Sequence, residues 1–444
     1  MKRVLAILLA MTMLILMTAC SKSTGGESSG SEGTKSGPTL PKYEITASTV
    51  KWLCWNSKSD LTDETTYLYE VNTMLKEHYN CELEIVRTTY DELPTKAASL
   101  VLGGNSPDLI FFRTQDYNTF IKQNIVQDVS SYIDFADPLW EDVKDVNDYF
   151  SYNGKNYLCV TSAINNSYIY YWKDVFTDAG LQTPLEMYKA GQWTLSDLRE
   201  LAKNVTADTD RDGLVDMYGI AVHPDNAWLC GGTDFVTKDE NGKWQMNLRD
   251  PGLNTFFDFM YNTSSAVDNS RLMQYNVTAD FTAKKAAMAW YEAWLLGTLG
   301  EQIKSGEIEF APSPQADGAD KYYVNGRAET AWVGANCANP GGAMAYLAVN
   351  RYLGTDEAQK ARLREKNKTL YGYTDEMFEL QEEMNSSKFE KTFTWQSTVG
   401  NWASDEGMWN LWSDVGLYET PWSNTVEKFA PILQANVDLA NSGE

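Results

Sequence analysis

The stretch Ser162 to Leu181, SAINNSYIYYWKDVFTDAGL, joins three patterns in one short segment. Small polar residues come first, and an aromatic strand follows at Tyr168 to Trp172. A helix is predicted over Lys173 to Ala179, because Gly180 is the residue type that commonly ends a helix. The local pattern favours an ordinary strand–helix unit whose aromatic rings fill a core. The alternative is a strand that crosses between two domains beside a cleft, and the rest of the chain must decide.

Length, charge and composition limit the class of protein. A chain of 444 residues is longer than one core usually supports, which predicts two domains. The formal net charge of -24 argues against nucleic acid and anionic lipid surfaces as partners, since both require a basic face. The whole chain contains two histidines, which leaves few residues from which to build a Ser-His-Asp triad or a histidine-ligated zinc site. Paired carboxylates for hydrolysis are not excluded by composition.

The N-terminus reads as an export signal. Lys2 and Arg3 precede an apolar run from Val4 to Met17, which is short for a membrane-spanning helix. The following Met17-Thr18-Ala19-Cys20 resembles the bacterial lipoprotein cleavage box, which implies lipidation of the Cys20 thiol. We therefore expect a signal peptide at 1–19. A Gly/Ser-rich tether should follow at 20–41, so that the chain is anchored to a membrane without spanning it.

The remaining cysteines show no metal or redox spacing. They are scattered and odd in number, and we interpret them as mostly buried free thiols, with one disulfide left possible. They are Cys54, Cys81, Cys159, Cys230 and Cys337.

Strands and helices alternate after the tether. Strands are predicted at 50–55, 81–86 and 106–112, with helices at 65–77 and 90–103 between them. Such alternation predicts an α/β fold with a parallel sheet, in which ligands bind beyond the carboxyl ends of the strands.

Seven stretches together resemble the extracellular solute-binding proteins of sugar ABC importers, the family that includes maltose-binding protein. They occur in the family's order across the mature chain, and each is weak alone. They are the lipoprotein box with its tether, the Trp55-Asn56 loop, PDLIFF at 107–112, YWKDVFTDAGL at 171–181, WTLSDLRELA at 193–202, KAAMAWYEAW at 285–294 and FAPSP at 310–314.

The resemblance implies an α/β, two-lobe periplasmic-binding-protein-like fold with an interdomain cleft and multiple hinge crossings. It implies a monomer that binds a carbohydrate between lobes and delivers it to the permease of an ABC transporter. Carried onto this sequence, lobe 1 comprises 42–161 and 315–354, lobe 2 comprises 166–309 and 355–444, and the crossings are 162–165 and 310–314.

An acidic loop has the spacing of a calcium site. In Asp208 to Asp216, acidic residues stand at loop positions 1, 3, 5 and 9 and glycine at position 6, as in EF-hand loops. Position 12 is Gly219, so the usual bidentate glutamate is absent. We expect structural Ca²⁺, and a solvated acidic turn is the alternative. The expected ligands are Asp208, Asp210, Asp212, the Leu214 carbonyl and Asp216.

The resemblance also implies a ligand wall of aromatic rings and polar side chains. Aromatic rings stack on sugar faces, whereas carboxylates and amides bind hydroxyls. The expected residues are Trp55, Asn56, Lys58, Asp60, Arg113, Gln115, Asp116, Asn165 and Trp294. The Trp-dense C-terminal region is expected to place one of its rings at the cleft, and Trp409 and Trp412, three residues apart, are included in the site. Its tryptophans are Trp395, Trp402, Trp409, Trp412 and Trp422. For each of them, core packing or a solvated loop is the alternative.

Three functions are therefore compared. The favoured one is a lipid-anchored, non-catalytic carbohydrate receptor on the extracellular face of a bacterial membrane. The second is an extracellular two-carboxylate glycoside hydrolase, although no signature of one is present. The third is a binding protein for a non-sugar solute such as a peptide, polyamine or anion. The sequence names neither the sugar nor the permease.

Overall fold

The computed structural model describes residues 37–223, 227–240, 242–272, 276–399, 408–416 and 419–442. The predicted signal peptide, the Cys20 lipidation site and most of the tether lie outside these residues. Among the described helices, none is both long enough and apolar enough to cross a membrane. The chain forms two compact units. Among the described residues, unit 1 comprises 37–113, 119–164 and 328–387, and unit 2 comprises those in 114–118, 165–327 and 388–442.

Unit 1 is built on a four-stranded sheet of order β13-β3-β1-β2. Strand β1 runs parallel to β2 and β3, and β13 pairs with β3 in the antiparallel sense. The strands are β1 (Thr49–Cys54), β2 (Glu82–Arg87), β3 (Leu109–Phe111) and β13 (Ala331–Val333). The main helices are α2 (Tyr67–Tyr79), α3 (Leu93–Leu102), α4 (Tyr117–Lys122, whose first two residues belong to unit 2), α5 (Lys144–Tyr149), α13 (Pro340–Thr355), α14 (Glu357–Tyr371) and α15 (Asp375–Asn385).

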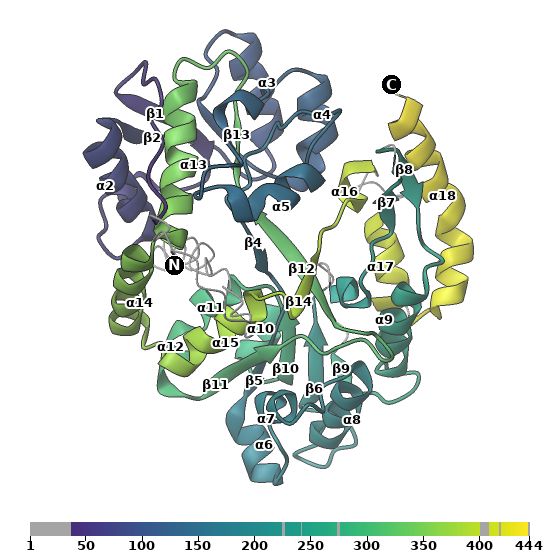
Figure 1. Cartoon of the computed structure of the whole chain (residues 1–444). Coiled ribbons are helices and arrows are strands. Elements are labelled where there is room, and N and C mark those ends of the chain that lie inside the picture. The colour runs from purple at the N-terminus through teal and green to yellow at the C-terminus, as the bar shows by residue number, and fades with distance from the viewer. Residues whose placement is uncertain are drawn as a thin grey trace, which may run out of the picture. The chain divides into compact units, whose positions relative to one another are not determined.

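The core of unit 1 lies between this sheet and α13. Helix α13 is buried along almost its whole length, because it packs against β1, α2 and α14 (Figure 1). A small residue is needed where α13 meets β1, because a Cβ at Gly342 would lie 2.8 Å from a methyl carbon of Val50 in β1.

Unit 2 is built on a five-stranded sheet of order β11-β5-β10-β6-β9 and a β7-β8 hairpin. The strands are β5 (Tyr168–Trp172), β6 (Tyr218–Val222), β7 (Val236–Lys238), β8 (Trp244–Met246), β9 (Arg271–Leu272), β10 (Ala286–Tyr291) and β11 (Ile308–Pro312). The helices are α6 (Lys173–Ala179), α7 (Pro184–Lys189), α8 (Leu195–Val205), α9 (Pro251–Asn262), α10 (Val277–Thr282), α11 (Leu295–Thr298), α12 (Gly300–Ser305), α16 (Gln396–Val399), α17 (Met408–Gly416) and α18 (Trp422–Ser442).

The aromatic strand of the opening segment is β5, and its predicted bounds are confirmed. Strand β5 lies between β10 and β11 and pairs antiparallel with both. Its side chains at 168–171 are all buried. Helix α6 then ends at Gly180, whose φ of 68° is left-handed and therefore suits glycine. The aromatic half of the segment is core, as the local pattern favoured.

The chain changes units inside two strands of a third sheet, β14-β12-β4. These strands are β4 (Ser162–Asn165), β12 (Tyr322–Glu329) and β14 (Phe389–Thr392). One change falls between Ile164 and Asn165, within the expected crossing at 162–165. The other falls between Arg327 and Ala328. Residues 310–314 lie inside unit 2, where 310–312 form the end of β11. The sequence had placed that second crossing at 310–314.

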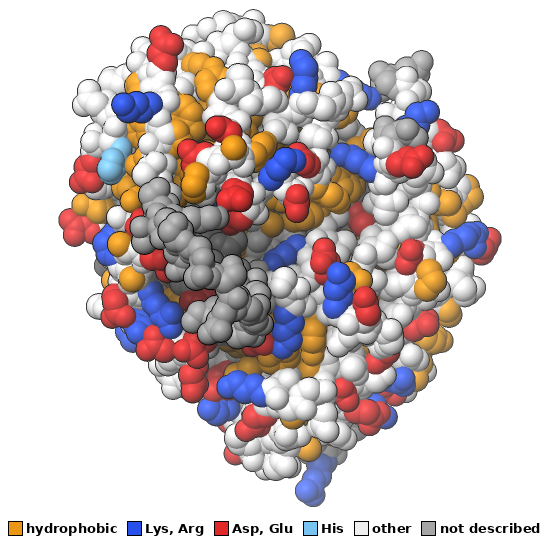
Figure 2. Space-filling model, viewed as in Figure 1, with side chains coloured by type: hydrophobic (Ala, Val, Ile, Leu, Met, Phe, Trp, Pro, Cys, Tyr) orange, Lys and Arg blue, Asp and Glu red, His pale blue; other side chains and the backbone are white. Residues whose placement is uncertain are grey.

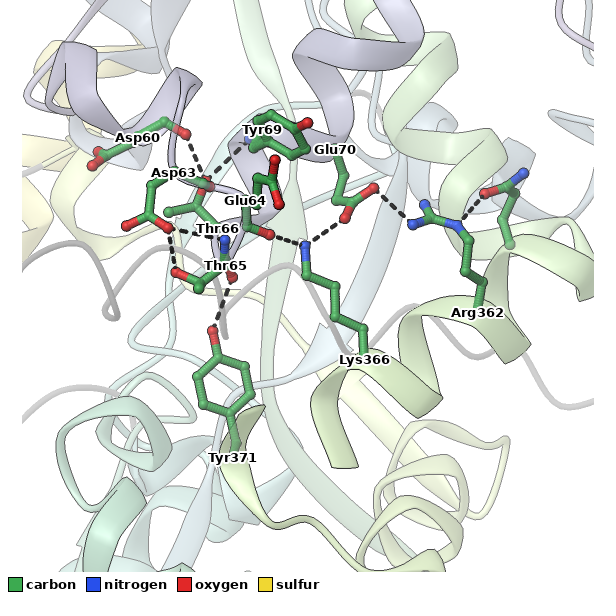
Figure 3. Close-up of polar contacts among 11 residues, drawn as sticks. Asp60, Asp63, Glu64, Thr65, Thr66, Tyr69, Glu70, Arg362, Lys366 and Tyr371 are labelled. Carbon is green, nitrogen blue, oxygen red and sulfur yellow. Dashed lines mark hydrogen bonds and ion pairs between the residues drawn. The ribbon is translucent and has the colours of Figure 1, made fainter. Parts of the chain in front are cut away.

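Helices α14 and α15 belong to unit 1, whereas the sequence analysis placed 355–444 wholly in lobe 2. Polar contacts explain the difference (Figure 3). Glu70 on α2 is nearly buried and pairs with Arg362 at 2.8 Å and with Lys366, both from α14. The Tyr371 hydroxyl donates to the Thr65 carbonyl. Two cations of α14 pair with this one buried carboxylate, and losing both would leave Glu70 unpaired in low dielectric, so the network holds α14 to α2.

The five cysteines after Cys20 are free thiols, and only Cys337 is partly exposed. Acidic and basic side chains are intermingled on the face shown in Figure 2.

Candidate functional site

Unit 1 buries polar side chains beyond the carboxyl end of β1. Asn56 follows β1 directly and is 3 % exposed, yet no described residue hydrogen-bonds its side-chain oxygen or nitrogen. Asp60 lies in the 3₁₀ turn η1 (Lys58–Leu61), where one carboxylate oxygen accepts from the Ser57 N–H at 2.9 Å. The other carboxylate oxygen is buried without a partner among the described residues. Unsatisfied buried polar atoms cost free energy, so this edge is suited to a ligand that supplies the missing hydrogen bonds.

Neighbouring elements hold this loop in place. Thr88 follows β2, and its N–H donates to the Cys54 carbonyl at 2.9 Å, which brings the ends of β1 and β2 together. The Thr66 hydroxyl at the start of α2 donates to the Asp60 carbonyl at 2.5 Å. Burial raises the pKa of Asp60, while the N–H of Ser57 opposes that shift. The carboxyl is therefore easier to protonate than an exposed aspartate.

An aromatic cluster adjoins this polar edge. Trp55 is partly exposed and packs against Phe111 and Tyr90, with ring centroids 4.0 and 5.4 Å apart. The Arg113 guanidinium lies over the Tyr90 ring, 4.6 Å from its centroid, and donates to the Tyr90 carbonyl. Cation–π attraction thus holds Arg113, which follows β3, on the Tyr90 ring that also contacts Trp55. Lys58, in contrast, is exposed in η1.

Unit 2 has a second polar and aromatic cluster, at the carboxyl end of β10. The Glu292 carboxylate accepts from Asn166 Nδ2 and from Trp294 Nε1, each at 2.9 Å. The Asn166 side-chain oxygen in turn accepts from the Ala293 N–H at 3.2 Å. This chain of hydrogen bonds fixes the indole of Trp294, which is partly exposed and so presents an aromatic surface.

His223 completes the unit 2 cluster. It follows β6, the parallel neighbour of β10, and its ring lies 4.4 Å from that of Tyr291. The Tyr291 ring is itself 5.1 Å from that of Trp294, edge to face. Burial lowers the pKa of His223 to about 4, although Glu292 opposes the shift. The imidazole is therefore neutral at physiological pH.

The other expected ligand residues have varied positions. Asn165 is fully buried in unit 2, and its side-chain oxygen accepts from the Ser167 N–H at 2.9 Å. Gln115 is exposed and Asp116 is buried, in η2 (Thr114–Asp116), which belongs to unit 2 and not to lobe 1 as the sequence suggested. Trp409 and Trp412 lie in α17, but their side chains are outside the described part of the structure.

Three of the expected calcium ligands gather in one place. Asp208, Asp210 and Asp216 are exposed, and one carboxylate oxygen of each lies within 4.8 Å of the others. Backbone N–H groups brace the loop: Asp208 accepts from Arg211 and Gly213, and Asp216 accepts from Thr209 at 2.6 Å. The Thr209 hydroxyl, together with the N–H groups of Thr209 and Asp210, donates to Asp216, lowers the pKa of that carboxyl and keeps it ionised. An oxygen-only set of this kind fits Ca²⁺.

The fourth aspartate and position 12 differ from an EF-hand. Asp212 accepts from the Leu214 N–H at 2.8 Å and is not among the three clustered carboxylates. Gly219 stands in β6, where a Cβ would lie 2.0 Å from the Ala202 carbonyl oxygen of α8. Close packing of helix on strand therefore excludes a glutamate at position 12, whatever ion binds.

Sequence reasoning missed Glu292, Asn166, Tyr90 and the placement of His223 at the site. Glu292 sits in the matched stretch KAAMAWYEAW, two residues before Trp294, and could have been found there. Asn166 adjoins the expected Asn165, but the sequence gives no sign of which amide faces Glu292.

Comparisons with known proteins give a family and a fold. A sequence profile described as bacterial extracellular solute-binding protein matches residues 58–360. Among curated proteins, none has a matching sequence.

Three solved structures illustrate the similarity. The GacH receptor of Streptomyces glaucescens, solved unliganded and with acarbose, has 16% identity and a TM-score of 0.62, covering 87% of this chain and 98% of its own. The galacto-N-biose/lacto-N-biose I-binding protein of Bifidobacterium longum has 15% identity and a TM-score of 0.62, and the match covers 90% of this chain and 99% of that protein. UgpB of Mycobacterium tuberculosis, in complex with glycerophosphocholine, has 14% identity and a TM-score of 0.62, and the match covers 88% of this chain and 99% of that protein. At such identities the likeness establishes a shared two-lobe α/β fold.

Proposed function

Because the chain belongs to the bacterial extracellular solute-binding protein family, we propose that it captures a carbohydrate and delivers it to an ABC permease without catalysis. The ligand is an uncharged oligosaccharide. Trp294 stacks on one of its sugar rings in unit 2, and Asn56 and Asp60 bind hydroxyl groups in unit 1.

The observation that carries the proposal is the Glu292–Trp294 pair. A partly exposed indole, fixed by a carboxylate at the end of a sheet strand, is the kind of rigid aromatic surface that sugar faces require. Asn56 supplies the complementary feature in unit 1, because its amide can both donate to and accept from hydroxyl groups.

The ligands of similar proteins support a carbohydrate but do not decide it. The GacH receptor was solved with acarbose and the Bifidobacterium protein with lacto-N-biose, whereas UgpB was solved with glycerophosphocholine. The ligand class must therefore be tested directly.

The test is a thermal-shift and tryptophan-fluorescence screen of a chain that starts after the tether. Maltotriose, acarbose, lacto-N-biose and glycerophosphocholine are the probes, and a saccharide that binds should raise the melting temperature by several degrees. The same mixtures are analysed by chromatography for hydrolysis products. A response to glycerophosphocholine alone would mean that the ligand is a phosphodiester and not a carbohydrate. Turnover of an oligosaccharide would favour the glycoside hydrolase.

The export proposal rests on the sequence around Cys20. Cys20 carries a diacylglyceryl group that holds the chain at the extracellular face of the cell membrane, with 20–41 as the tether. Metabolic labelling with an alkyne fatty acid should mark the wild-type chain and not Cys20→Ser, which should appear in the medium. Equal labelling of both chains would contradict the anchor.

The loop at Asp208 to Asp216 binds one structural Ca²⁺ through Asp208, Asp210, Asp216 and the Leu214 carbonyl. At a calcium concentration a hundred times the dissociation constant, binding adds about 2.7 kcal/mol to stability. The melting temperature should fall on adding EDTA to the wild type and to Asp178→Asn, an exposed control. It should be unaffected by EDTA in Asp210→Asn, and an equal response in all three would exclude this site.

A further inference from the structure

Lys238 places its ammonium group among three aromatic rings of unit 2. The Nζ atom lies 4.1 Å from the ring centroid of Trp395, 4.9 Å from that of Trp244 and 5.4 Å from that of Tyr117. All three rings are buried, at 5 % exposure or less. We call Lys238 with these three residues the aromatic box.

Among the described residues, the ammonium has no partner besides these rings. No hydrogen bond or ion pair of Lys238 occurs within the described part of the chain, and burial is the only influence on its pKa. Burial lowers that pKa to about 8, so most of the group is still charged at neutral pH. Cation–π attraction is therefore the interaction that compensates for its partial desolvation.

The aromatic box joins three segments that are distant in sequence. Lys238 and Trp244 are cross-strand neighbours in the β7-β8 hairpin. The hairpin is anchored independently, because Asn441 of α18 exchanges two hydrogen bonds of 2.9 Å with the Trp244 backbone. Trp395 is also anchored independently, since its backbone N–H donates to the carboxylate of the buried Asp234 at 2.6 Å.

Tyr117 belongs to the segment that most needs an anchor. Residues 114–118 lie in unit 2, but the chain on both sides of them belongs to unit 1. Besides the aromatic box, Thr398 of α16 holds the segment: its hydroxyl donates to the Thr114 carbonyl at 3.1 Å, and its carbonyl accepts from Asn118 at 3.2 Å.

From this arrangement we propose that Lys238 is a positioning residue whose ammonium, held in the aromatic box, fixes 114–118 to unit 2 and so places Gln115 and Asp116 for ligand binding. The role in ligand binding rests on the proposed function. The anchoring itself does not, because it concerns contacts inside unit 2 alone.

Hydrogen–deuterium exchange of the full chain without ligand tests the anchoring. Lys238→Met keeps the length of the side chain and removes the charge, so exchange at 114–122 should accelerate about tenfold while the β5-β10 pair is unchanged. Lys238→Arg should restore slow exchange. Lys243→Met, an exposed lysine on the same hairpin, is the matched control and should resemble wild type.

Unchanged exchange at 114–122 in Lys238→Met, or an equal change in Lys243→Met, would overturn the proposal. If Lys238→Met does not fold, Tyr117→Leu removes the most distant ring and should give a smaller acceleration in the same peptide, whereas Tyr117→Phe should give none. Equal exchange in these two variants would also overturn it.

A second measurement separates the anchoring from the proposed function. With whichever saccharide the screen identifies, Lys238→Met should bind about tenfold more weakly than Lys243→Met. Faster exchange with unaltered affinity would keep the anchor but remove its role in ligand binding. If no saccharide binds the wild type, the proposed function fails while the exchange result still decides the anchor.

Discussion

The ends of β1 and β10 carry comparable residue types in opposite states. In unit 2, Glu292, Asn166 and Trp294 satisfy one another through hydrogen bonds of 2.9 Å. In unit 1, Asn56 and one oxygen of Asp60 are buried without a partner in the described chain. The unit 2 cluster is a preorganised surface, whereas the unit 1 edge pays a desolvation cost that a ligand can relieve.

The largest expected effect concerns acid stability of the unit 2 cluster. The pKa of His223 is about 4 in the fold and about 6.5 unfolded, so the unfolded chain binds more protons between these values. Stability is therefore lost as pH falls from 6.5 to 4, by about 3 kcal/mol. Chemical unfolding at pH 7 and pH 4 should show that His223→Gln loses less stability than wild type.

Two controls sharpen this result. His78→Gln changes the other histidine, on an exposed part of α2, and should lose as much stability in acid as wild type. Asp60→Asn should lose more, because the raised pKa of Asp60 makes protonation of the folded chain favourable as pH falls. If His223→Gln and His78→Gln behave alike, the imidazole does not set the acid response.

The next effect concerns the aromatic surfaces. Trp294→Ala should weaken saccharide binding by about 2 kcal/mol, roughly thirtyfold, because a fixed indole loses little entropy on stacking. Trp55→Ala should cost less affinity, since Trp55 is already covered in part by Phe111 and Tyr90. Isothermal titration checks both, with Trp294→Phe expected to retain most of the binding. A greater loss in Trp55→Ala would reverse the assignment of the main stacking surface.

The smallest effect is the most direct test of the comparison. Asn56→Leu removes unsatisfied polar atoms and should raise the free energy of unfolding by about 1 kcal/mol while weakening binding. Asn166→Leu should lower that free energy, because it leaves Glu292 and the Ala293 N–H without their partner. Denaturant unfolding of the unliganded proteins measures both. A change of the same sign in the free energy of unfolding of both variants would mean that the unit 1 edge and the unit 2 cluster do not differ in hydrogen bonding as described.

Local pattern predicted some elements closely. The bounds of β5 and α6 follow from an aromatic run and a terminating glycine, which act within a few residues. The membership of α14 in unit 1 could not be predicted, because it depends on Glu70 meeting Arg362 and Lys366 from a distant helix. The candidate sites were predicted in part: Asn56, Asp60 and Trp294 came from family order, and their ligand roles stay predictions.

By itself, the sequence determined the α/β class, the family and the strand ends where polar residues gather. These follow from periodicity and motif order, which are properties of neighbouring residues. Only the tertiary structure decided that Asn56 is unsatisfied while Asn166 is bonded to Glu292, and that 114–118 belongs to unit 2 beside Lys238. Those facts depend on which distant segments pack together, and hydrogen bonding and burial are set by that packing.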